Sequence, residues 1–136
     1  MEVEEKLSPS RVAHAINESM SLTAECSRIG SAAVVRVVGA VDGETASELQ
    51  RVCRQAMAVG DKTLILDFTG VEYVSSAGLG TVLVAGKQIS GIGGQLRICG
   101  LSPRVKKIFD LAGFDTLFGF YDSPEDAMVD CRNGNS

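Results

Sequence analysis

Residues 66–80, which read LDFTGVEYVSSAGLG, give the most informative structural pattern in the sequence. The apolar run just before it, residues 63–66, predicts a strand that is covered on both faces of a sheet. Thr69-Gly70 predicts a turn, and residues 71–74 predict a further short strand-like run. Small residues then open a helix that we expect over about residues 77–89. The stretch therefore predicts a strand that gives way to a helix at a corner containing two serines.

The residues before this stretch predict a hairpin followed by one helix. Two strand-like runs, residues 22–29 and 33–38, surround Gly30-Ser31, as is typical of a hairpin. A turn is expected over residues 39–43, and Asp42 can cap the next helix through its side-chain oxygen. That helix is expected over about residues 44–59, with Arg51 and Arg54 directed away from its apolar face. The apolar face is formed by Ala46, Leu49, Cys53 and Ala56.

The residues after it predict one more strand and two more helices. Residues 91–94 are expected to form a loop, and residues 95–99 a strand. Ser102-Pro103 is typical of a helix start, and this helix is expected to end at Gly113. Ser123-Pro124 opens a last short helix in the same way. Strands that alternate with helices after a hairpin predict an α/β fold, with a mixed, mostly parallel central sheet of four to five strands and about four helices.

The two ends of the chain differ from the part expected to fold. Residues 1–20 are polar, and we interpret them as an N-terminal extension in which residues 11–20 could form a short helix. One folded domain is expected over residues 21–132, since 136 residues suit a single domain. Residues 133–136 are expected to be a disordered tail.

Composition argues against several classes of function. Hydrophobic residues make up 45% and charged residues 22% of the chain, as in ordinary globular proteins. The net charge of −4 and the lack of a Lys/Arg tract argue against binding to nucleic acid or to an anionic membrane. No apolar run approaches the roughly 20 residues of a membrane span, and the N-terminus is acidic where a signal peptide is basic. We therefore expect a cytoplasmic protein.

Cysteine and histidine usage does not suggest a metal site. The chain has one histidine, and no two of its four cysteines have the C-x-x-C spacing of a metal or redox motif. Buried, reduced thiols are the expectation for a cytosolic protein. The cysteines concerned are Cys26, Cys53, Cys99 and Cys131. Neither a metal nor a cofactor is expected.

The serine corner suits a reversible modification. The first amides of a helix have no intrahelical acceptor and carry a partial positive charge. A serine hydroxyl at this position can cap the helix, and a phosphate dianion is stabilised there even better. Ser75 and Ser76 are followed by small residues, so the backbone is accessible from outside. The pattern therefore favours a serine that can alternate between free and phosphorylated states without unfolding the domain.

The serines and glycines allow three other interpretations, namely a plain N-cap, a nucleophile elbow and a phosphate-binding loop. Ser75-Ser76 could be no more than an N-cap, which is a common helix start. The nucleophile elbow G-x-S-x-G fails because Val74 stands two residues before Ser76, and the only histidine, His14, lies in the extension. The loop over residues 91–94 is rich in glycine but precedes a strand and lacks a phosphate-binding pattern.

An ordered set of motifs over about residues 22–131 resembles the STAS domain, and within it the stand-alone anti-sigma-factor antagonists of bacterial partner-switching systems. The set begins at a Gly-x-x-Asp corner, includes the serine corner, and continues to the helix that starts at Ser102. Its parts are Gly39–Asp42 with Thr45-Ala46, Ser75–Leu79, Lys87–Ile89, Gly93-Gly94, and Ser102–Asp110 with Gly113.

The resemblance implies a STAS fold and a binding switch rather than an enzyme. By position, the phosphorylated serine of the family falls on Ser76, and Ser75, which replaces the acid of the family, is an alternative acceptor. The implied partners are an anti-sigma factor that is also a serine protein kinase, and a serine phosphatase. Asp42 is the acid that the family places close to the phosphorylation site. The unphosphorylated form would bind the kinase and free the sigma factor, and phosphorylation would release the partner.

The expected contact residues surround this corner. Packing in the core is the favoured role of Tyr73 and Leu79, with partner contact as the second role. Glu44 can also be a simple first-turn acid, and Asp42 can serve both as a cap and as a contact. The full set of expected partner-binding residues is Asp42, Glu44, Tyr73, Ser75, Ser76, Leu79 and Gly80.

Two alternatives stay open. The same domain could be a scaffold or a regulatory subunit of another partner-switching, secretion or transporter system without a sigma factor. A small enzyme or nucleotide-binding domain is the second alternative, but the sequence has no clustered catalytic acids, metal set or phosphate loop.

Overall fold

The computed structural model describes residues 21–60 and 62–132, with residues 130–132 described for the backbone only. The predicted extension with its helix over residues 11–20, and the predicted tail over residues 133–136, lie outside the described residues. The elements are β1 (Leu22–Ile29), β2 (Ala32–Val41), α2 (Ala46–Ala58), β3 (Thr63–Val74), α3 (Ser76–Gly91), β4 (Gln95–Cys99), α4 (Pro103–Leu111), the 3-10 helix η3 (Phe114–Thr116), β5 (Gly119–Tyr121) and α5 (Pro124–Arg132).

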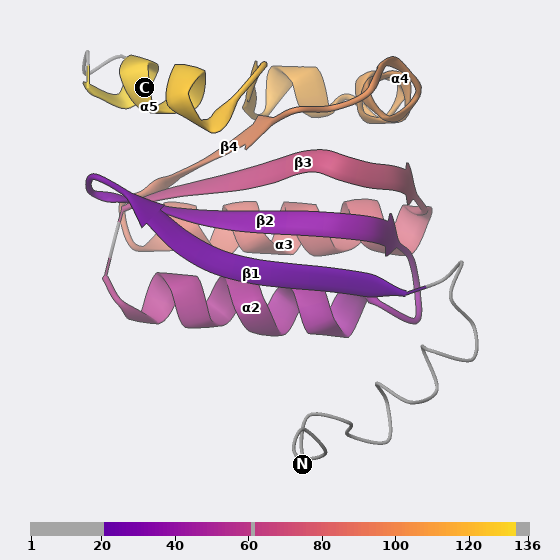
Figure 1. Cartoon of the computed structure of the whole chain (residues 1–136), viewed down its shortest axis with the longest axis horizontal. Helices are drawn as coiled ribbons and strands as arrows, with labels where there is room; N and C mark the ends of the chain where they lie inside the picture. The colour runs from indigo at the N-terminus through magenta and orange to yellow at the C-terminus, as the bar shows by residue number, and fades with distance from the viewer. Residues whose placement is uncertain (1–20, 61, 133–136) are drawn as a thin grey trace.

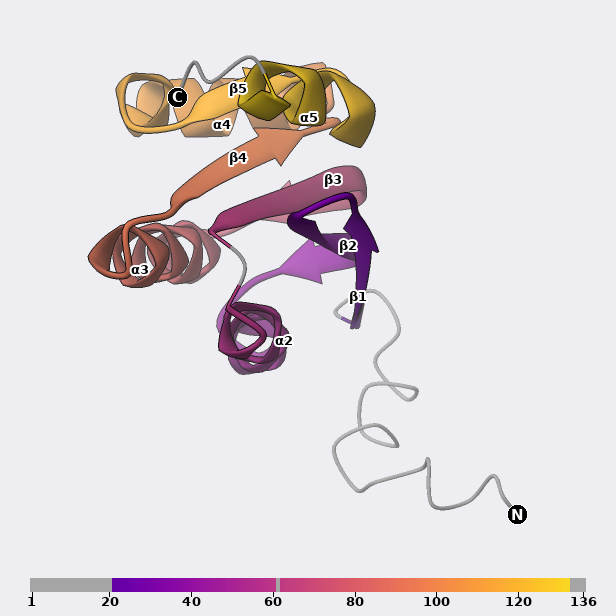
Figure 2. The ribbon, with the colours of Figure 1, turned by 90° about the vertical axis from the view of Figure 1, so that its left-hand side faces the viewer.

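The five strands form one mixed sheet with the order β1-β2-β3-β4-β5. The hairpin pair β1–β2 is antiparallel, and the three other pairs are parallel. Figure 1 shows α2 and α3 behind the sheet, and Figure 2 shows them on one side of it, with α4 and α5 gathered at the β5 edge. This arrangement confirms the predicted α/β class and the mixed, mostly parallel sheet.

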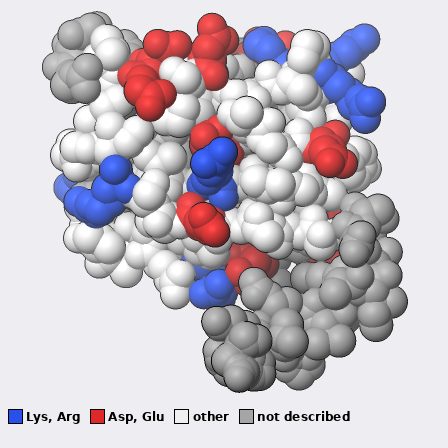
Figure 3. Space-filling view, in the orientation of Figure 1, with Lys and Arg blue, Asp and Glu red and all other residues white. Residues whose placement is uncertain are grey.

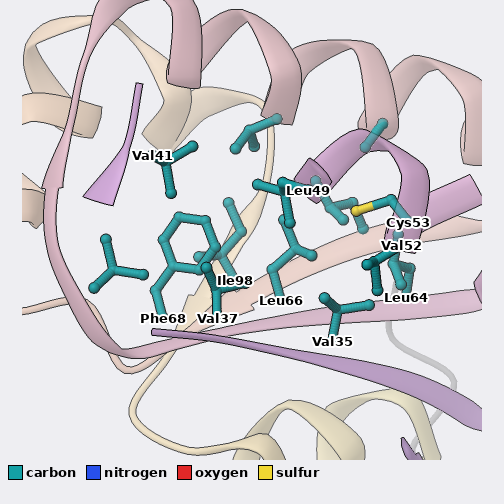
Figure 4. Close-up of a cluster of buried hydrophobic side chains, with 14 of the residues drawn as sticks. Val35, Val37, Val41, Leu49, Val52, Cys53, Leu64, Leu66, Phe68 and Ile98 are labelled. Carbon is teal, nitrogen blue, oxygen red and sulfur yellow. The ribbon is translucent and has the colours of Figure 1, made fainter. Parts of the chain in front are cut away.

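The main core lies between the sheet and the helices α2, α3 and α4. Leu49 and Cys53 of α2 meet Leu64, Leu66 and Phe68 of β3 in this cluster (Figure 4), and none of the five is more than 1% exposed. Burial of this apolar surface is the main source of stability of the domain.

A smaller core lies on the other face of the sheet, under α5. There Ile65 of β3 packs with Ala127 and Met128 of α5. Since Leu64 and Leu66 point into the main core while Ile65 points into the small one, the predicted strand with two covered faces is confirmed.

The predicted turn at Thr69-Gly70 is wrong, because β3 is one continuous strand of 12 residues. Its pairing with β2 contains two register shifts, so the polar residues mark a bulged strand rather than a turn. At Gly70 a Cβ would lie 2.9 Å from Cγ2 of Val38, so glycine permits the close approach of the two strands. The Asp67 carboxylate accepts hydrogen bonds from the amide and the hydroxyl of Thr69, which holds this irregular segment.

Helix α2 differs slightly from its expectation. It begins at Ala46 rather than near residue 44, and Ala46 is only half-buried. Arg51 and Arg54 are exposed, as predicted. The buried face consists of Leu49, Val52, Cys53 and Ala56.

Two of the cysteine thiols are buried as expected and one is not. Burial raises the pKa of both the Cys53 and the Cys99 thiol to about 12. Cys26 is exposed, because β1 is an edge strand whose middle is left uncovered by α2. The side chain of Cys131 is not among those described.

The sequence predicted only part of strand β2 and did not predict strand β5. Strand β2 extends to Val41 instead of ending at Val38, and the predicted turn is therefore shorter. Strand β5 and the helix η3 had no predicted range, since three residues of each are too short to give a periodic signal.

Candidate functional site

The serine corner begins where β3 ends at Val74. Ser75 has an extended backbone and is the N-cap of α3, and its Oγ accepts a hydrogen bond from the amide of Gly78 at 3.2 Å. The helix starts at Ser76, one residue earlier than predicted. The hydroxyl of Ser75 is therefore committed to holding the first turn of the helix.

Ser76 occupies the opposite situation, one residue further on. It is the first residue of α3 and is exposed, and its hydroxyl has no hydrogen-bond partner among the described residues. The amides at the start of a helix point outward and carry partial positive charge. The structure thus presents the Ser76 Oγ to a partner, next to backbone groups that favour an anion.

The first turn of α3 is pressed against the end of β2. The amide of Ser75 donates to the carbonyl of Val41 at 2.9 Å. Gly78 is buried, and a Cβ on it would lie only 2.4 Å from the same carbonyl oxygen. The absence of a side chain at Gly78 therefore lets the helix start sit beside the β2–α2 loop, where Asp42 lies.

Asp42 holds that loop in place. The side chain is buried at 5% exposure, and its Oδ1 accepts hydrogen bonds from the amides of Glu44 at 2.9 Å and Thr45 at 3.1 Å. Thr45 Oγ1 in turn donates to the carbonyl of Ala40 at 2.7 Å. The prediction that Asp42 caps α2 is therefore wrong in position: the N-cap is Thr45, and the Asp42 side chain organises the turn ahead of the helix. Its second oxygen, Oδ2, is buried and has no hydrogen-bond partner in the described part of the chain.

The core role predicted for Tyr73 is wrong, whereas that of Leu79 is confirmed. Tyr73 is 47% exposed, because the second register shift in β3 turns Val71 and Val74 inward and leaves Tyr73 outside. Leu79 is half-buried and packs against the main core. Glu44 is exposed, and its position in the turn before α2 agrees with that of an acid near a helix start.

One exposed residue of this surface was not identified from the sequence. Val84 is 38% exposed and lies one turn after Gly80, which itself lies one turn after Ser76. A Cβ on Gly80 would meet nothing within 4 Å, so the outer side of α3 is open and flat there. The spacing of four residues from Ser76 through Gly80 to Val84 was the signal that could have revealed it.

The two segments that form the corner carry only negative side-chain charge, and Arg104 of α4 lines a surface pocket together with Glu72. Residues 42–45 and 72–80 contain three carboxylates, those of Asp42, Glu44 and Glu72, and no lysine or arginine. A negative group added to Ser76 would therefore find no counterion within these two segments. Within these segments its stabilisation would come from the backbone amides at the start of α3.

The described residues show neither a metal-binding cluster nor a membrane-spanning helix. Residues 21–60 and 62–132 contain no group of three or more His, Cys, Asp or Glu side chains that could hold a metal ion. Nor is any helix in these residues long and apolar enough to cross a membrane.

The fold and the corner together define a small α/β domain with one mixed sheet, in which α3 is capped by Ser75 and begins with the exposed Ser76. The STAS domain family matches residues 23–127 of this chain. The chain belongs to the STAS domain family and, within it, groups with the anti-sigma factor antagonists.

Two of the similar proteins are bacterial regulators. BtrV of Bordetella bronchiseptica, whose assignment as an anti-sigma factor antagonist is provisional, is 32% identical over 110 residues, which are 81% of this chain and 93% of BtrV. The crystal structure of an anti-sigma factor antagonist from Mycobacterium paratuberculosis superposes with a TM-score of 0.76 at 25% identity, covering 82% of this chain and 95% of that one.

The same fold also occurs as part of a transporter. The murine anion transporter Slc26a9 matches 90% of this chain with a TM-score of 0.74 at 15% identity, but the match covers only 24% of the transporter. At this identity the likeness shows a shared fold alone.

Proposed function

We propose that the chain is an anti-sigma-factor antagonist that works as a phosphorylation-controlled switch. Its unphosphorylated form binds an anti-sigma factor that is also a serine kinase, and the sigma factor is thereby freed. Phosphorylation of Ser76 releases the partner, and a serine phosphatase restores the binding form. The protein acts in the cytoplasm as a binding module and performs no chemistry itself.

The exposed hydroxyl of Ser76 is the observation that carries this proposal. Ser75 is half-buried and its Oγ is engaged with Gly78, so Ser76 is the better acceptor of the two. A kinase can reach the Ser76 Oγ without opening the core. The amides at the start of α3 can stabilise the resulting phosphate, which allows the domain to stay folded.

The charge of the corner explains why a phosphate would act as a release signal. Phosphorylation adds about −1.5 to −2 charges at neutral pH. Because residues 42–45 and 72–80 hold three carboxylates and no cation, the added charge is not neutralised within them. It would repel the phosphates of a nucleotide bound to the partner kinase. A penalty of about 3 kcal/mol corresponds to roughly a hundredfold loss of affinity.

The proposed contact surface follows the exposed groups around Ser76. Tyr73 lies at its β3 end, Glu44 at its α2 end, and Gly80 on the outer side of α3. Val84 extends the surface by one helical turn. The other three residues of the predicted set are less exposed and lie beneath this surface. They are Asp42, which is buried, and Ser75 and Leu79, which are half-buried.

The test is Ser76→Asp, measured against the anti-sigma-factor kinase of the source organism by titration calorimetry. The affinity should fall by roughly a hundredfold while the fold is unchanged, since an acid is favourable in the first turn of a helix. Ser90→Asp is the matched control, because Ser90 is exposed on the same helix at its far end, about 20 Å away. The control should bind like the wild type. Equal binding by Ser76→Asp and the wild type would contradict the switch.

Mass spectrometry tests which of the two serines accepts the phosphate. After incubation with the kinase and ATP, mass spectrometry should place the phosphate on Ser76 in the wild type and in Ser75→Ala. Ser76→Ala should remain unmodified. A phosphate that follows Ser75 instead would move the switch by one residue.

A regulatory domain attached to a transporter is the second candidate, favoured by the fold shared with Slc26a9. In that case neither the wild type nor Ser76→Asp would show measurable affinity for the kinase. The same titration therefore separates the two candidates.

A further inference from the structure

Two patches of opposite charge lie along one border of the molecule. Helix α4 carries three exposed cations, and the start of α5, together with the loop just before it, carries three exposed acids. Both views of the ribbon place these helices at the β5 edge, and Figure 3 shows basic side chains over α4 and acidic side chains over α5. The basic patch consists of Arg104, Lys106 and Lys107, and the acidic patch of Asp122, Glu125 and Asp126.

Most of these charges are not compensated within the described part of the molecule. Lys106 Nζ bonds Asp110 Oδ2 of the same helix at 3.0 Å. Neither Arg104 nor Lys107 forms an ion pair with the described residues, and the three acids of the other patch form none either. Both patches are therefore available to groups of opposite charge from outside.

Each patch is continued by an exposed apolar side chain one helical turn further on. Leu111 follows Lys107 on α4 and is 80% exposed, on the side opposite to the buried Val105 and Phe109. Val129 follows Glu125 on α5 and is 44% exposed. A single exposed apolar residue needs no explanation. Here there are two such residues, and the uncompensated charges beside them are of opposite sign, basic at Leu111 and acidic at Val129. The two patches are therefore complementary to each other.

We propose that the chain forms a homodimer in which α4 of one copy packs against α5 of the other around a two-fold axis. A two-fold axis through this border brings each basic patch onto the acidic patch of the second copy, and it creates the same contact twice. Leu111 of one copy then lies near Val129 of the other. An anionic membrane fits less well, because the acidic patch beside α4 would be repelled by it.

The energies of surface ion pairs give the expected affinity of the dimer. Exposed ion pairs contribute about 0.2–1 kcal/mol each and are weakened by salt. With only a few apolar side chains to add to them, the dimer should be weak and sensitive to ionic strength. Ser76 itself belongs to neither patch, although Arg104 lines one surface pocket with Glu72 of the serine corner. The dimer is therefore tested by self-association in the absence of any kinase, which is independent of the proposed switch.

Sedimentation equilibrium of the full chain, with two charge-reversed variants, tests the dimer. The first variant is Arg104→Glu/Lys107→Glu, and the second is Asp122→Lys/Glu125→Lys. The wild type should dimerise at about 50 mM salt and weaken by at least tenfold near 500 mM. Each variant alone should lose at least tenfold, because both of its contacts become repulsive.

The decisive sample is the equimolar mixture of the two variants. Both contacts of the mixed dimer are attractive again, so association should return to near the wild-type level. This rescue also shows that both variants are folded. Arg54→Glu/Lys87→Glu is the matched control for the first variant, since it makes the same change in net charge on exposed residues of α2 and α3. It should dimerise like the wild type.

Several outcomes would overturn the dimer. These are a wild type that stays monomeric at the highest soluble concentration, a mixture that does not associate, or a control that loses association as the variants do. A monomeric wild type that binds vesicles of phosphatidylserine and phosphatidylcholine through Arg104 and Lys107 would assign the basic patch to a membrane instead.

Discussion

Helices α3 and α4 begin with nearly the same cap, but the residue that follows the cap differs. Ser75 caps α3 by accepting from the amide of Gly78 at 3.2 Å, and Ser102 caps α4 by accepting from the amide of Val105 at 3.2 Å. In both cases the serine has an extended backbone and the donor is three residues further on. The cap itself is thus ordinary helix chemistry and does not distinguish a functional corner from a structural one.

The residue after the cap makes the difference. At α4 it is Pro103, which has no hydroxyl and suits the first helical position because its nitrogen has no proton to donate. At α3 it is Ser76, which presents an exposed hydroxyl at the same point of the helix. The residue after the cap of α3 thus carries an exposed Oγ that the helix start does not use, which is the property that the proposed phosphorylation of Ser76 requires.

The donor to each cap also differs. Val105 of α4 places its side chain in the main core and is fully buried. Gly78 of α3 has no side chain, and the carbonyl of Val41 occupies the space where a Cβ would lie. Helix α4 is thus held by a side chain, whereas α3 is held by a direct backbone approach that keeps Ser76 close to the β2–α2 loop.

Gly78→Ala should have the largest effect on the free energy of unfolding. The new Cβ would lie 2.4 Å from the Val41 oxygen, so the helix start or the strand must move. A loss of about 3 kcal/mol is expected from overpacking of this kind. Urea denaturation followed by circular dichroism measures it.

The control for this prediction is Gly80→Ala on the same helix. Nothing lies within 4 Å of a Cβ there, so alanine should stabilise the protein by about 0.5–1 kcal/mol through its higher helix propensity. If the two variants were equally stable, the close approach of α3 to Val41 would not be a constraint.

Removal of the caps should have a smaller effect that is similar at both helices. Ser75→Ala and Ser102→Ala each lose one hydrogen bond to an amide of the first turn, and each should cost about 1 kcal/mol. The same denaturation experiment compares them. A cost at Ser75 far above that at Ser102 would show that Ser75 does more than cap the helix.

The similarity of the two caps also explains what the sequence could predict. The pattern Ser-Pro and the pattern Ser-Ser both indicate a helix start, so both helices were placed to within two residues. Which of the two serines caps α3 could not be derived, because either hydroxyl can reach an amide of the first turn. The choice depends on the path of β3, whose bulges are set by contacts with β2.

Tyr73 illustrates the same limit. An aromatic residue at the end of an apolar strand favours burial, and regular alternation from Val71 would place it in the core. The register shift between Gly39 and Ala40 breaks this alternation and brings Tyr73 to the surface. The proposed acceptor Ser76 and the acid Asp42 could be predicted from motifs, whereas the exposure of Tyr73 and Val84 required the strand register and the helix orientation.

Ser76→Ala should have the smallest effect on stability and thereby sharpen the division between the two serines. Its hydroxyl makes no hydrogen bond with the described residues, and alanine is a good helix former, so the free energy of unfolding should stay within about 0.5 kcal/mol of the wild type. Measured beside Ser75→Ala, this result would place the structural role on Ser75 alone. A loss at Ser76 as large as that at Ser75 would mean that both hydroxyls hold the helix, and the exposed serine would then not be free to accept a phosphate without a cost to the fold.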